Sequence, residues 1–437
     1  MYNLIMNKKL QSMFQSLLKH ELVSGSAFIF TGALIGNFLA FILNLFYARK
    51  LSYADYAIFA SLASVITLAA IPAGSISTVI VKFATKFFVE KQDDKLKNFY
   101  ILFFKFMMYL SLFMIVFFIV FSGSLRSYLH IENIWYVIVL GFVISSFYLN
   151  TLNMAFLQSM LKFKFIAILD IIGSIFKLTA GVALVLLGYK VFGGLGALFA
   201  MAFGSYLVAY FPLLKIFKSA NSDKKIALNI NEILFYAAPT FLAILFMTSF
   251  TSTDIILVKH FFSPQMAGFY SGLSLIGRVI FYFTGVIPTV MFPLLIKRHA
   301  AKKNFNNLFY LALFLVLIPS VSITLFYFVF PNFAINLFLG GRGYLSVSGY
   351  LGLFGIYLTV FSLVNVCVNF FLSFNKTNVS AFVVLAAVLQ VVLIYIFHAN
   401  FYQVIFSSLA ALSILLIILL YLFFRNYGSS RPLSLKS

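Results

Sequence analysis

Long stretches without any charged residue constrain this chain more than any other feature. Five of them lie at 22–48, 133–161, 191–214, 304–341 and 377–424. Because 63% of all residues are hydrophobic and only 9% are charged, most of the chain cannot form a surface in water. The sequence therefore predicts an integral membrane protein. The few charges inside its membrane-spanning segments would then mark functional residues.

The apolar segments have the length of membrane-spanning helices. A bilayer core about 30 Å thick is crossed by a helix of roughly 20 residues. Barrel strands are not expected, because no segment alternates between polar and apolar residues as such strands do. The run 377–424 is too long for one span and is divided at 398–400. The twelve predicted spans are 24–47, 56–80, 99–121, 133–157, 166–187, 192–214, 233–258, 269–295, 306–329, 345–372, 379–397 and 402–424.

The distribution of Lys and Arg predicts the orientation of these helices. With the amino terminus placed in the cytoplasm, the inner segments hold 22 of the 31 Lys and Arg residues, and the outer loops hold 6. Such an excess on one side is the positive-inside pattern of membrane proteins, so both termini are predicted to be cytoplasmic. The net charge of +21 then indicates attraction to anionic membrane lipids, and it gives no reason to expect a nucleic-acid partner.

A weak internal repeat predicts two halves of similar architecture. Residues 50–62 and 260–273 each run from a polar loop through Phe and Tyr into small residues and Leu. Farther along, Ile71-Pro72 and Ile287-Pro288 each precede a basic helix end, and the two prolines are candidate hinges. We therefore predict an all-α membrane fold with two six-helix lobes around a central cavity.

The same reasoning predicts the division of the chain into domains. Residues 5–22 place several apolar side chains on one face, which indicates a helix lying at the membrane surface. The predicted domains are an N-terminal lobe at 1–214 that includes this helix, a basic linker at 215–232, a C-terminal lobe at 233–424 and a cytoplasmic tail at 425–437.

Charged residues within the spans are the first candidates for a functional site. A charge near the bilayer centre costs roughly 2.5–3.5 kcal/mol, so it requires a partner or an aqueous cavity. Lys177 and Arg278 lie well inside their spans. Each either forms a buried ion pair or lines a cavity that receives an anionic group such as a diphosphate. Asp170 and Asp254 lie nearer to helix ends and are possible charge partners, while Lys105 can extend its charge to the membrane surface.

Amide side chains in the spans are the second set of candidates. Asn37, Asn44 and Asn369 are candidates for contacting sugar hydroxyls, with hydrogen bonding between helices as the alternative for each. The single Cys367 excludes an internal disulfide, and the five histidines have no metal-ligand spacing. Neither a phosphate-binding loop nor an acidic pair in an outer loop is present. We therefore predict no catalytic residues, no metal and no cofactor.

Several short motifs resemble one family of membrane transporters. The stretch Tyr47–Tyr56 (YARKLSYADY) is similar to a junction between the first two helices of Wzx-type polysaccharide flippases. These belong to the multidrug/oligosaccharidyl-lipid/polysaccharide exporter superfamily. Phe156–Ser159 with Lys162-Phe163 is similar to their short basic connection after the fourth helix, and 272–293, with Arg278 and Pro288, resembles their eighth helix. The resemblance covers essentially the whole chain.

The resemblance implies a function. It implies movement of an undecaprenyl-diphosphate-linked oligosaccharide, such as an O-antigen or capsule repeat unit of lipopolysaccharide or exopolysaccharide synthesis, across the bacterial inner membrane by alternating access. Related lipid II flippases carry an arginine in helix 8 that faces the cavity, and Arg278 matches that position. A polysaccharide polymerase and a chain-length regulator are implied as partners. Coupling to a proton gradient, a sodium gradient or the membrane potential is left open.

Two alternatives remain at this point. The chain lacks buried arginines in its first two helices and lacks two further C-terminal helices, which argues against lipid II as the substrate. It also lacks a buried acidic residue in the first helix, which argues against a cation-coupled drug exporter. A small-molecule antiporter is nevertheless one alternative function. A membrane-embedded polysaccharide polymerase or glycosyltransferase is the other.

Overall fold

Apolar helices make up almost all of the computed structural model, which describes residues 21–217, 230–300, 305–374, 376 and 378–427. Within these ranges the chain contains helices and no strand. Eleven helical segments of the described residues are long and apolar enough to cross a membrane. The remaining predicted span, 233–258, is helical as α10 (Ile230–Phe261). The predicted all-α, multi-pass membrane fold is therefore confirmed.

The ends of several predicted spans coincide closely with the observed helices. The span predicted at 306–329 is α14 (Asn306–Val329), and the break predicted at 398–400 separates α17 (Val379–Ile396) from α18 (Phe401–Tyr427). The predicted surface helix at 5–22 falls outside the described residues except for its last two positions. Most of the linker 215–232 and the end of the tail also lie outside them.

The chain divides into two compact units that do not follow a single cut in the sequence. Unit 1 consists of residues 1–43, 72–122 and 134–237, and unit 2 consists of 44–71, 123–133 and 238–437. Residues 44–71 and 123–133, which the sequence assigned to the N-terminal lobe, thus pack with the second half of the chain. The lobe boundaries at 214 and 233 stay a prediction.

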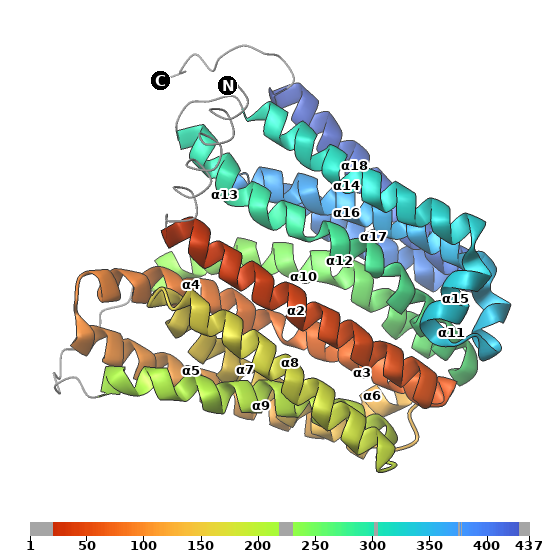
Figure 1. Cartoon of the computed structure of the whole chain (residues 1–437), viewed down its shortest axis with the longest axis horizontal. Helices are drawn as coiled ribbons and strands as arrows, with labels where there is room; N and C mark the ends of the chain where they lie inside the picture. Colours follow the sequence, from red (N-terminus) through yellow and green to blue (C-terminus); the bar gives the residue numbers. More distant parts are fainter. Residues whose placement is uncertain (1–20, 218–229, 301–304, 375, 377, 428–437) are drawn as a thin grey trace, which may run out of the picture. The chain divides into compact units, whose positions relative to one another are not determined.

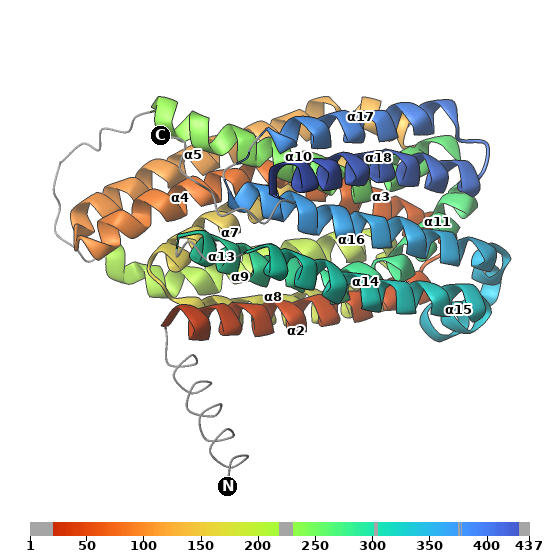
Figure 2. The ribbon, with the colours of Figure 1, turned by 90° about the horizontal axis from the view of Figure 1, so that it is seen from above.

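Unit 1 is a bundle of long helices. Neighbouring pairs are α5 with α7, α7 with α9, and α8 with α9, and these helices run side by side in both views (Figures 1 and 2). The helices of this unit are the first part of α2 (Glu21–Lys50), α4 (Ile71–Val89), α5 (Asp93–Val120), α7 (Trp135–Ser159), α8 (Phe163–Leu186) and α9 (Lys190–Phe217).

Small residues and buried amides hold the helices of unit 1 together. A Cβ added at Gly32 would lie 2.8 Å from the backbone of Ala167 on α8, so α2 and α8 approach each other as closely as two backbones allow. On other helices, Asn153 accepts a hydrogen bond from the Tyr100 hydroxyl (2.8 Å) and donates one to the Tyr206 carbonyl (3.2 Å). Glycine at position 32 thus permits the close approach of α2 to α8.

Unit 2 contains the remaining helices. In it, α16 packs against α14 and α18, and α17 packs against α18 (Figures 1 and 2). Its elements are the end of α2, α3 (Tyr53–Ala69), most of α6 (Ser122–Tyr128), most of α10, α11 (Pro264–Gly277), α12 (Val279–Thr284), α13 (Val286–Ala300), α14, α15 (Pro331–Leu339), the 3-10 helix η1 (Arg342–Tyr350), α16 (Leu351–Ser373), α17 and α18.

Helix interruptions occur at both predicted hinges. The helix is interrupted between α3 and α4 just before Pro72, and between α12 and α13 just before Pro288. A proline has no N–H group, and its ring clashes with the carbonyl four residues earlier. For Pro288 that residue is Thr284, where α12 ends. The internal repeat of the sequence therefore corresponds to helix interruptions at equivalent positions in the structure.

The junction that carried the family resemblance is held by contacts within unit 2. The Arg49 Nε donates a hydrogen bond to the Phe338 carbonyl (2.9 Å), and the same guanidinium donates to the Leu337 carbonyl. These carbonyls end α15, and a cation at a helix C-terminus satisfies groups that have no partner within the helix. The Tyr344 hydroxyl adds a bond to the Ala48 carbonyl (3.2 Å). These contacts explain why residues 44–71 belong to unit 2.

Candidate functional site

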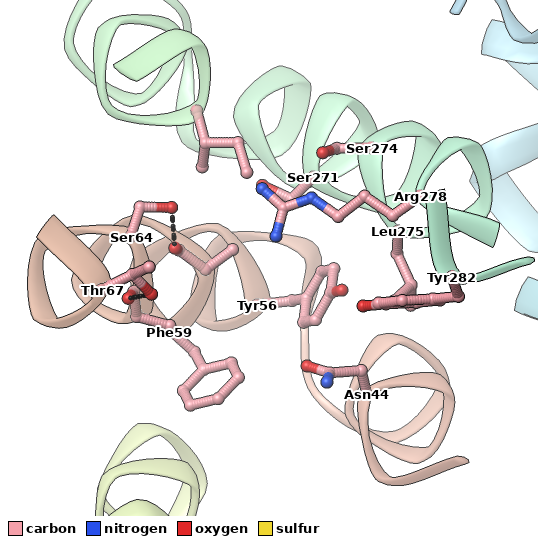
Figure 3. A pocket seen from close by; sticks show the side chains of 13 residues that line it. Asn44, Tyr56, Phe59, Ser64, Thr67, Ser271, Ser274, Leu275, Arg278 and Tyr282 are labelled. Carbon is pink, nitrogen blue, oxygen red and sulfur yellow. Dashed lines mark hydrogen bonds between the residues drawn. The ribbon is translucent and has the colours of Figure 1, made fainter. Parts of the chain in front are cut away.

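A polar cavity of about 90 Å³ lies in unit 2 between α3 and α11 (Figure 3). Two of the predicted site residues, Asn44 and Arg278, contribute to its wall. The full lining consists of Asn44, Tyr56, Phe59, Ala60, Ala63, Ser64, Thr67, Ile255, Ser271, Ser274, Leu275, Arg278 and Tyr282. Hydroxyl groups, one amide and one guanidinium thus share a small space in a chain that is otherwise strongly apolar.

Helical periodicity explains how α3 and α11 each direct one side toward the cavity. On α3 the lining residues recur at intervals of three and four, as at Tyr56, Ala60, Ala63 and Thr67. Residues spaced in this way lie on one face of a helix. The lining residues of α11 and α12 follow the same rule from Ser271 to Tyr282. Because many of these side chains are small, the two helices leave a hollow between them.

Equivalent capping places the two helices in the same way. The Ser52 hydroxyl accepts a hydrogen bond from the Asp55 N–H (3.0 Å) at the start of α3, and the Ser263 hydroxyl accepts one from the Met266 N–H (3.4 Å) at the start of α11. A serine at this position satisfies a donor that the first helical turn leaves unpaired. The two helices that belong to the internal repeat, α3 and α11, thus begin with the same kind of cap, pack together and form the cavity.

Three of the six hydroxyl groups in the cavity lining donate their hydrogen to the backbone of their own helix. Ser64, Thr67 and Ser271 donate to backbone carbonyls four residues earlier, at 2.9, 2.8 and 2.8 Å. Their oxygens still have lone pairs that can accept hydrogen bonds. The cavity therefore combines acceptors, which suit a ligand rich in hydroxyl groups, with a guanidinium that suits an anion.

Arg278 is the only cation in the lining and stands at the helix interruption between α11 and α12. Its side chain is half-buried and lies among Tyr56, Ser271 and Tyr282 in the close-up (Figure 3). The guanidinium donates a hydrogen bond to the Thr251 carbonyl of α10. An arginine has five N–H donors in a planar fork, so this contact leaves others for a ligand.

Lys177 has a different setting, in unit 1. It lies half-buried on α8, and no hydrogen bond or ion pair to it is present within the described residues. Asp170, its possible partner, is two helical turns away on the same helix, which corresponds to about 10 Å along the axis. The two cations of the sequence prediction thus belong to different compact units.

The other predicted residues are distributed over both units. Asn37 is exposed on α2 in unit 1, and Asn369 donates to the backbone and side-chain oxygens of Asn365 (2.8 and 3.0 Å) on α16. Asp254 is buried on α10, where its charge and that of Arg278 attract each other. Apart from Arg278 and Asn44, none of the predicted site residues lines the cavity.

Sequence reasoning missed the hydroxyl groups of the cavity, notably Tyr56, Tyr282 and Ser274. Serine and tyrosine occur throughout membrane helices, so no single one stands out. The available signal was their periodicity, because small and hydroxyl-bearing residues recur at helical spacing in both parts of the internal repeat. Applied to 56–67 and 271–282, that pattern predicts two polar faces.

Comparison with known proteins places the chain in a family. It matches the model of a family described as "Polysaccharide biosynthesis protein" over residues 46–348. The chain belongs to this family. The matched range begins just before the Arg49 junction and includes every cavity residue except Asn44. No curated protein matches the chain significantly.

Several solved transporters share the fold. One is the lipid II flippase MurJ in an inward closed conformation, with 18% identity, a TM-score of 0.66 and coverage of 90% of this chain and 86% of that chain. Another is the MATE multidrug transporter DinF-BH, with 15% identity, a TM-score of 0.66 and coverage of 92% and 95%.

A third is a MOP superfamily transporter from Pyrococcus furiosus, which is described as having a binding pocket of reverse polarity. It has 14% identity, a TM-score of 0.59 and coverage of 93% and 94%. At these identities the likeness shows the fold alone, which is that of MOP and MATE transporters. This family member is therefore a multi-pass membrane protein with a transporter fold.

Proposed function

We propose that this family member is a flippase for an undecaprenyl-diphosphate-linked oligosaccharide, which it moves from the inner to the outer leaflet of a bacterial inner membrane by alternating access. Its substrate would be a repeat unit of O-antigen, capsule or exopolysaccharide. The observation that carries the proposal is the cavity between α3 and α11, which places Arg278 among hydroxyl groups within membrane-spanning helices.

The chemistry of the cavity suits the junction between a diphosphate and a sugar. Arg278 offers a fork of donors to phosphate oxygens, and its charge is permanent. The oxygens of Ser64, Thr67 and Ser271 accept hydrogen bonds from sugar hydroxyls, because their own hydrogens are engaged within the helices. The cavity receives the diphosphate and the first sugar in this proposal, while the prenyl chain remains in the lipid.

The energetics of transport require no bond-breaking step and no cofactor. Moving one negative charge outward through a potential of about 100 mV, negative inside, is favourable by about 2.3 kcal/mol. The membrane potential thus assists export of an anionic complex. Both termini lie in the cytoplasm in this proposal, since the Lys and Arg excess is then on the inner side. The protein acts as a transporter and not as an enzyme, with anionic lipids, a polymerase and a chain-length regulator as partners.

Replacement of Arg278 tests the proposal in cells whose surface glycan depends on this protein. We expect Arg278→Ala to lower surface glycan by at least about tenfold while the amount of protein in the membrane stays normal, because one charge-assisted contact contributes roughly 1.5–3 kcal/mol. The matched control is Lys105→Ala, since Lys105 is also a cation within a span but is exposed on α5. Normal glycan in the Arg278→Ala strain would remove this residue from the mechanism.

A small-molecule antiporter is the second candidate, because DinF-BH shares the fold as closely as MurJ does. The two candidates differ in which export activity depends on the cavity. Loss of export of a cationic dye in the Arg278→Ala strain, with surface glycan intact, would favour the antiporter. Elongation of glycan chains by the purified protein would instead show a polymerase.

A further inference from the structure

A buried carboxylate lies directly behind the wall of the Arg278 cavity. Asp254 is 1% exposed and follows Thr251, whose carbonyl accepts the Arg278 hydrogen bond, by one turn of α10. The next residue, Ile255, lines the cavity. The guanidinium therefore contacts a backbone carbonyl beside Asp254 while its charge acts on the carboxylate.

The Asp254 carboxylate is held in place without Arg278. One of its oxygens accepts a hydrogen bond from the Tyr270 hydroxyl at 2.9 Å, and the other accepts one from the Ile255 N–H at 2.8 Å. Arg278 can thus turn toward a ligand while the carboxylate keeps its position. The pair then behaves as two separately anchored charges and not as a rigid salt bridge.

Within the described residues, the other titratable groups that interact with this pair are tyrosines. Tyr56 of α3, Tyr270 of α11 and Tyr357 of α16 each interact electrostatically with Arg278. Tyr282 of α12 lines the same cavity. Phenols are neutral near physiological pH, so these tyrosines do not alter the charge of the site there. The neutral Gln390 side chain of α17 and the Tyr357 hydroxyl both donate hydrogen bonds to the Phe250 carbonyl. The protonation of Asp254 therefore decides whether the pair is neutral or carries one positive charge.

We propose that Asp254 is the counter-charge that sets the affinity of Arg278 for an anion, so that an anionic head group and one proton bind together. The proton comes from solvent and is bound by the Asp254 carboxylate, and it leaves when the anion leaves. Asp254 is a positioning residue, since it acts through Arg278 and does not touch the ligand. The proposal deepens the proposed function and rests on it only for the identity of the anion.

The physical reason is competition for one cation. When Asp254 is ionised, Arg278 is already neutralised by a charge in a weakly polarisable environment, and an incoming phosphate meets the repulsion of that carboxylate. When Asp254 is protonated, the whole charge of Arg278 is available to the phosphate. We expect an affinity difference on the order of tenfold between the two states, which corresponds to one unit of pH in a linked equilibrium.

Calorimetry on the purified full chain in detergent tests the linkage with inorganic pyrophosphate as the probe. Titrations across the pH profile of binding, in buffers of different ionisation enthalpy, count the protons taken up per anion bound. A tenfold difference between the two states allows at most about half a proton to be taken up, at the midpoint of the pH profile of binding. At that midpoint we expect Asp254→Asn to bind about threefold more tightly than the wild type and to take up about half a proton fewer. Protonation of pyrophosphate itself is common to both proteins and cancels. Equal proton counts and equal affinities in the two proteins would overturn the proposal.

Two further variants complete the test. Arg278→Gln should lose pyrophosphate binding at every pH, and retained binding would contradict the role of Arg278 as the anion's partner. Tyr270→Phe removes a donor that favours the charged carboxylate, so the midpoint of the pH profile of binding should move to higher pH. This variant serves if Asp254→Asn does not fold, and an unchanged midpoint would then overturn the proposal.

The calorimetric result separates failure of this inference from failure of the proposed function. Proton-linked binding of pyrophosphate does not depend on which glycan the protein transports. If Arg278→Ala leaves surface glycan normal but the proton count differs as expected, Arg278 has no role in glycan export, the flippase proposal loses the observation that carries it, and the proton linkage stands. If surface glycan is lost but the wild type and Asp254→Asn take up equal numbers of protons, the flippase proposal stands and the proton linkage fails.

Discussion

Arg278 and Lys177 are both cations within membrane-spanning helices, yet their surroundings in the structure differ. Arg278 lines a hollow of hydroxyl groups, contacts the Thr251 carbonyl and is attracted by a buried carboxylate. Lys177 has none of these within the described residues, and its nearest acidic residue on α8 is two turns away. Two cations that lie equally far inside their predicted spans can thus differ: one belongs to a polar site, and the other lies on an apolar helix.

The difference shows what a membrane cation requires. Around Arg278 the neighbouring helices supply compensating groups, so the cost of removing the charge from water is partly offset. Around Lys177 that cost is not offset by any described side chain. The groove beside it on α8 and α9 is lined by Phe176, Thr179, Ala180, Ala183, Ala200, Phe203 and Gly204, of which only Thr179 is polar. The comparison therefore favours Arg278 as the anion site and leaves Lys177 as a prediction.

The largest expected effect comes from separating the two helices that make the cavity. A Cβ added at Gly268 would lie 2.2 Å from the Tyr53 carbonyl oxygen, and backbone atoms cannot yield as a flexible side chain does. Gly268→Ala should destabilise the protein by about 3 kcal/mol or more, measured by thermal unfolding in detergent, and abolish glycan export. Gly349→Ala is the control, since nothing lies within 4 Å of its added Cβ.

The second prediction compares the two cations directly. Lys177→Leu should stabilise the protein by about 1–2 kcal/mol, because it removes a charge without a described partner from an apolar helix. Arg278→Ala should instead destabilise it by about 1 kcal/mol, because the Thr251 carbonyl loses its donor. Thermal unfolding of both variants under identical conditions gives the comparison. A destabilised Lys177→Leu protein would show that Lys177 has a structural partner.

The smallest expected effect concerns single hydroxyl groups. Thr67→Val removes an acceptor from the cavity while keeping the side-chain shape, and we expect glycan export to fall about fivefold, corresponding to about 1 kcal/mol. Thr179→Val is the matched control, since this threonine also bonds to a carbonyl four residues earlier (2.9 Å) but lines the apolar groove of unit 1. Equal export by the two variants would mean that the cavity does not contact the sugar.

Much of the architecture followed from the sequence because lipid permits few solutions. Every backbone group within a bilayer needs an internal partner, so a long apolar run becomes a helix regardless of its neighbours. For this reason α14 has the predicted bounds. Helices are interrupted next to Pro72 and Pro288, because a proline has no N–H group to donate. The family resemblance came from short motifs at 47–56, 156–163 and 272–293, and the family match over 46–348 includes all three.

The site was less predictable, because its residues come from helices far apart in the chain. Arg278 was identified since a charge in a span is rare. Tyr56 and Ser274 were not, since hydroxyl residues are common in membrane helices and only the contact of α3 with α11 distinguishes them. The assignment of 44–71 to unit 2 was equally invisible in sequence, because the Arg49 contacts span nearly 300 positions, as with its bond to Phe338.

The sequence by itself determined that this chain crosses a membrane many times as helices, because local hydrophobicity and backbone hydrogen bonding are sufficient for that. It also identified Arg278 as a residue that needs an explanation. Only the tertiary structure decided that this arginine faces hydroxyl groups and a buried Asp254, whereas Lys177 does not. Partners for a buried charge come from whichever helices pack beside it, and that packing depends on side-chain fit between distant segments and not on any local pattern.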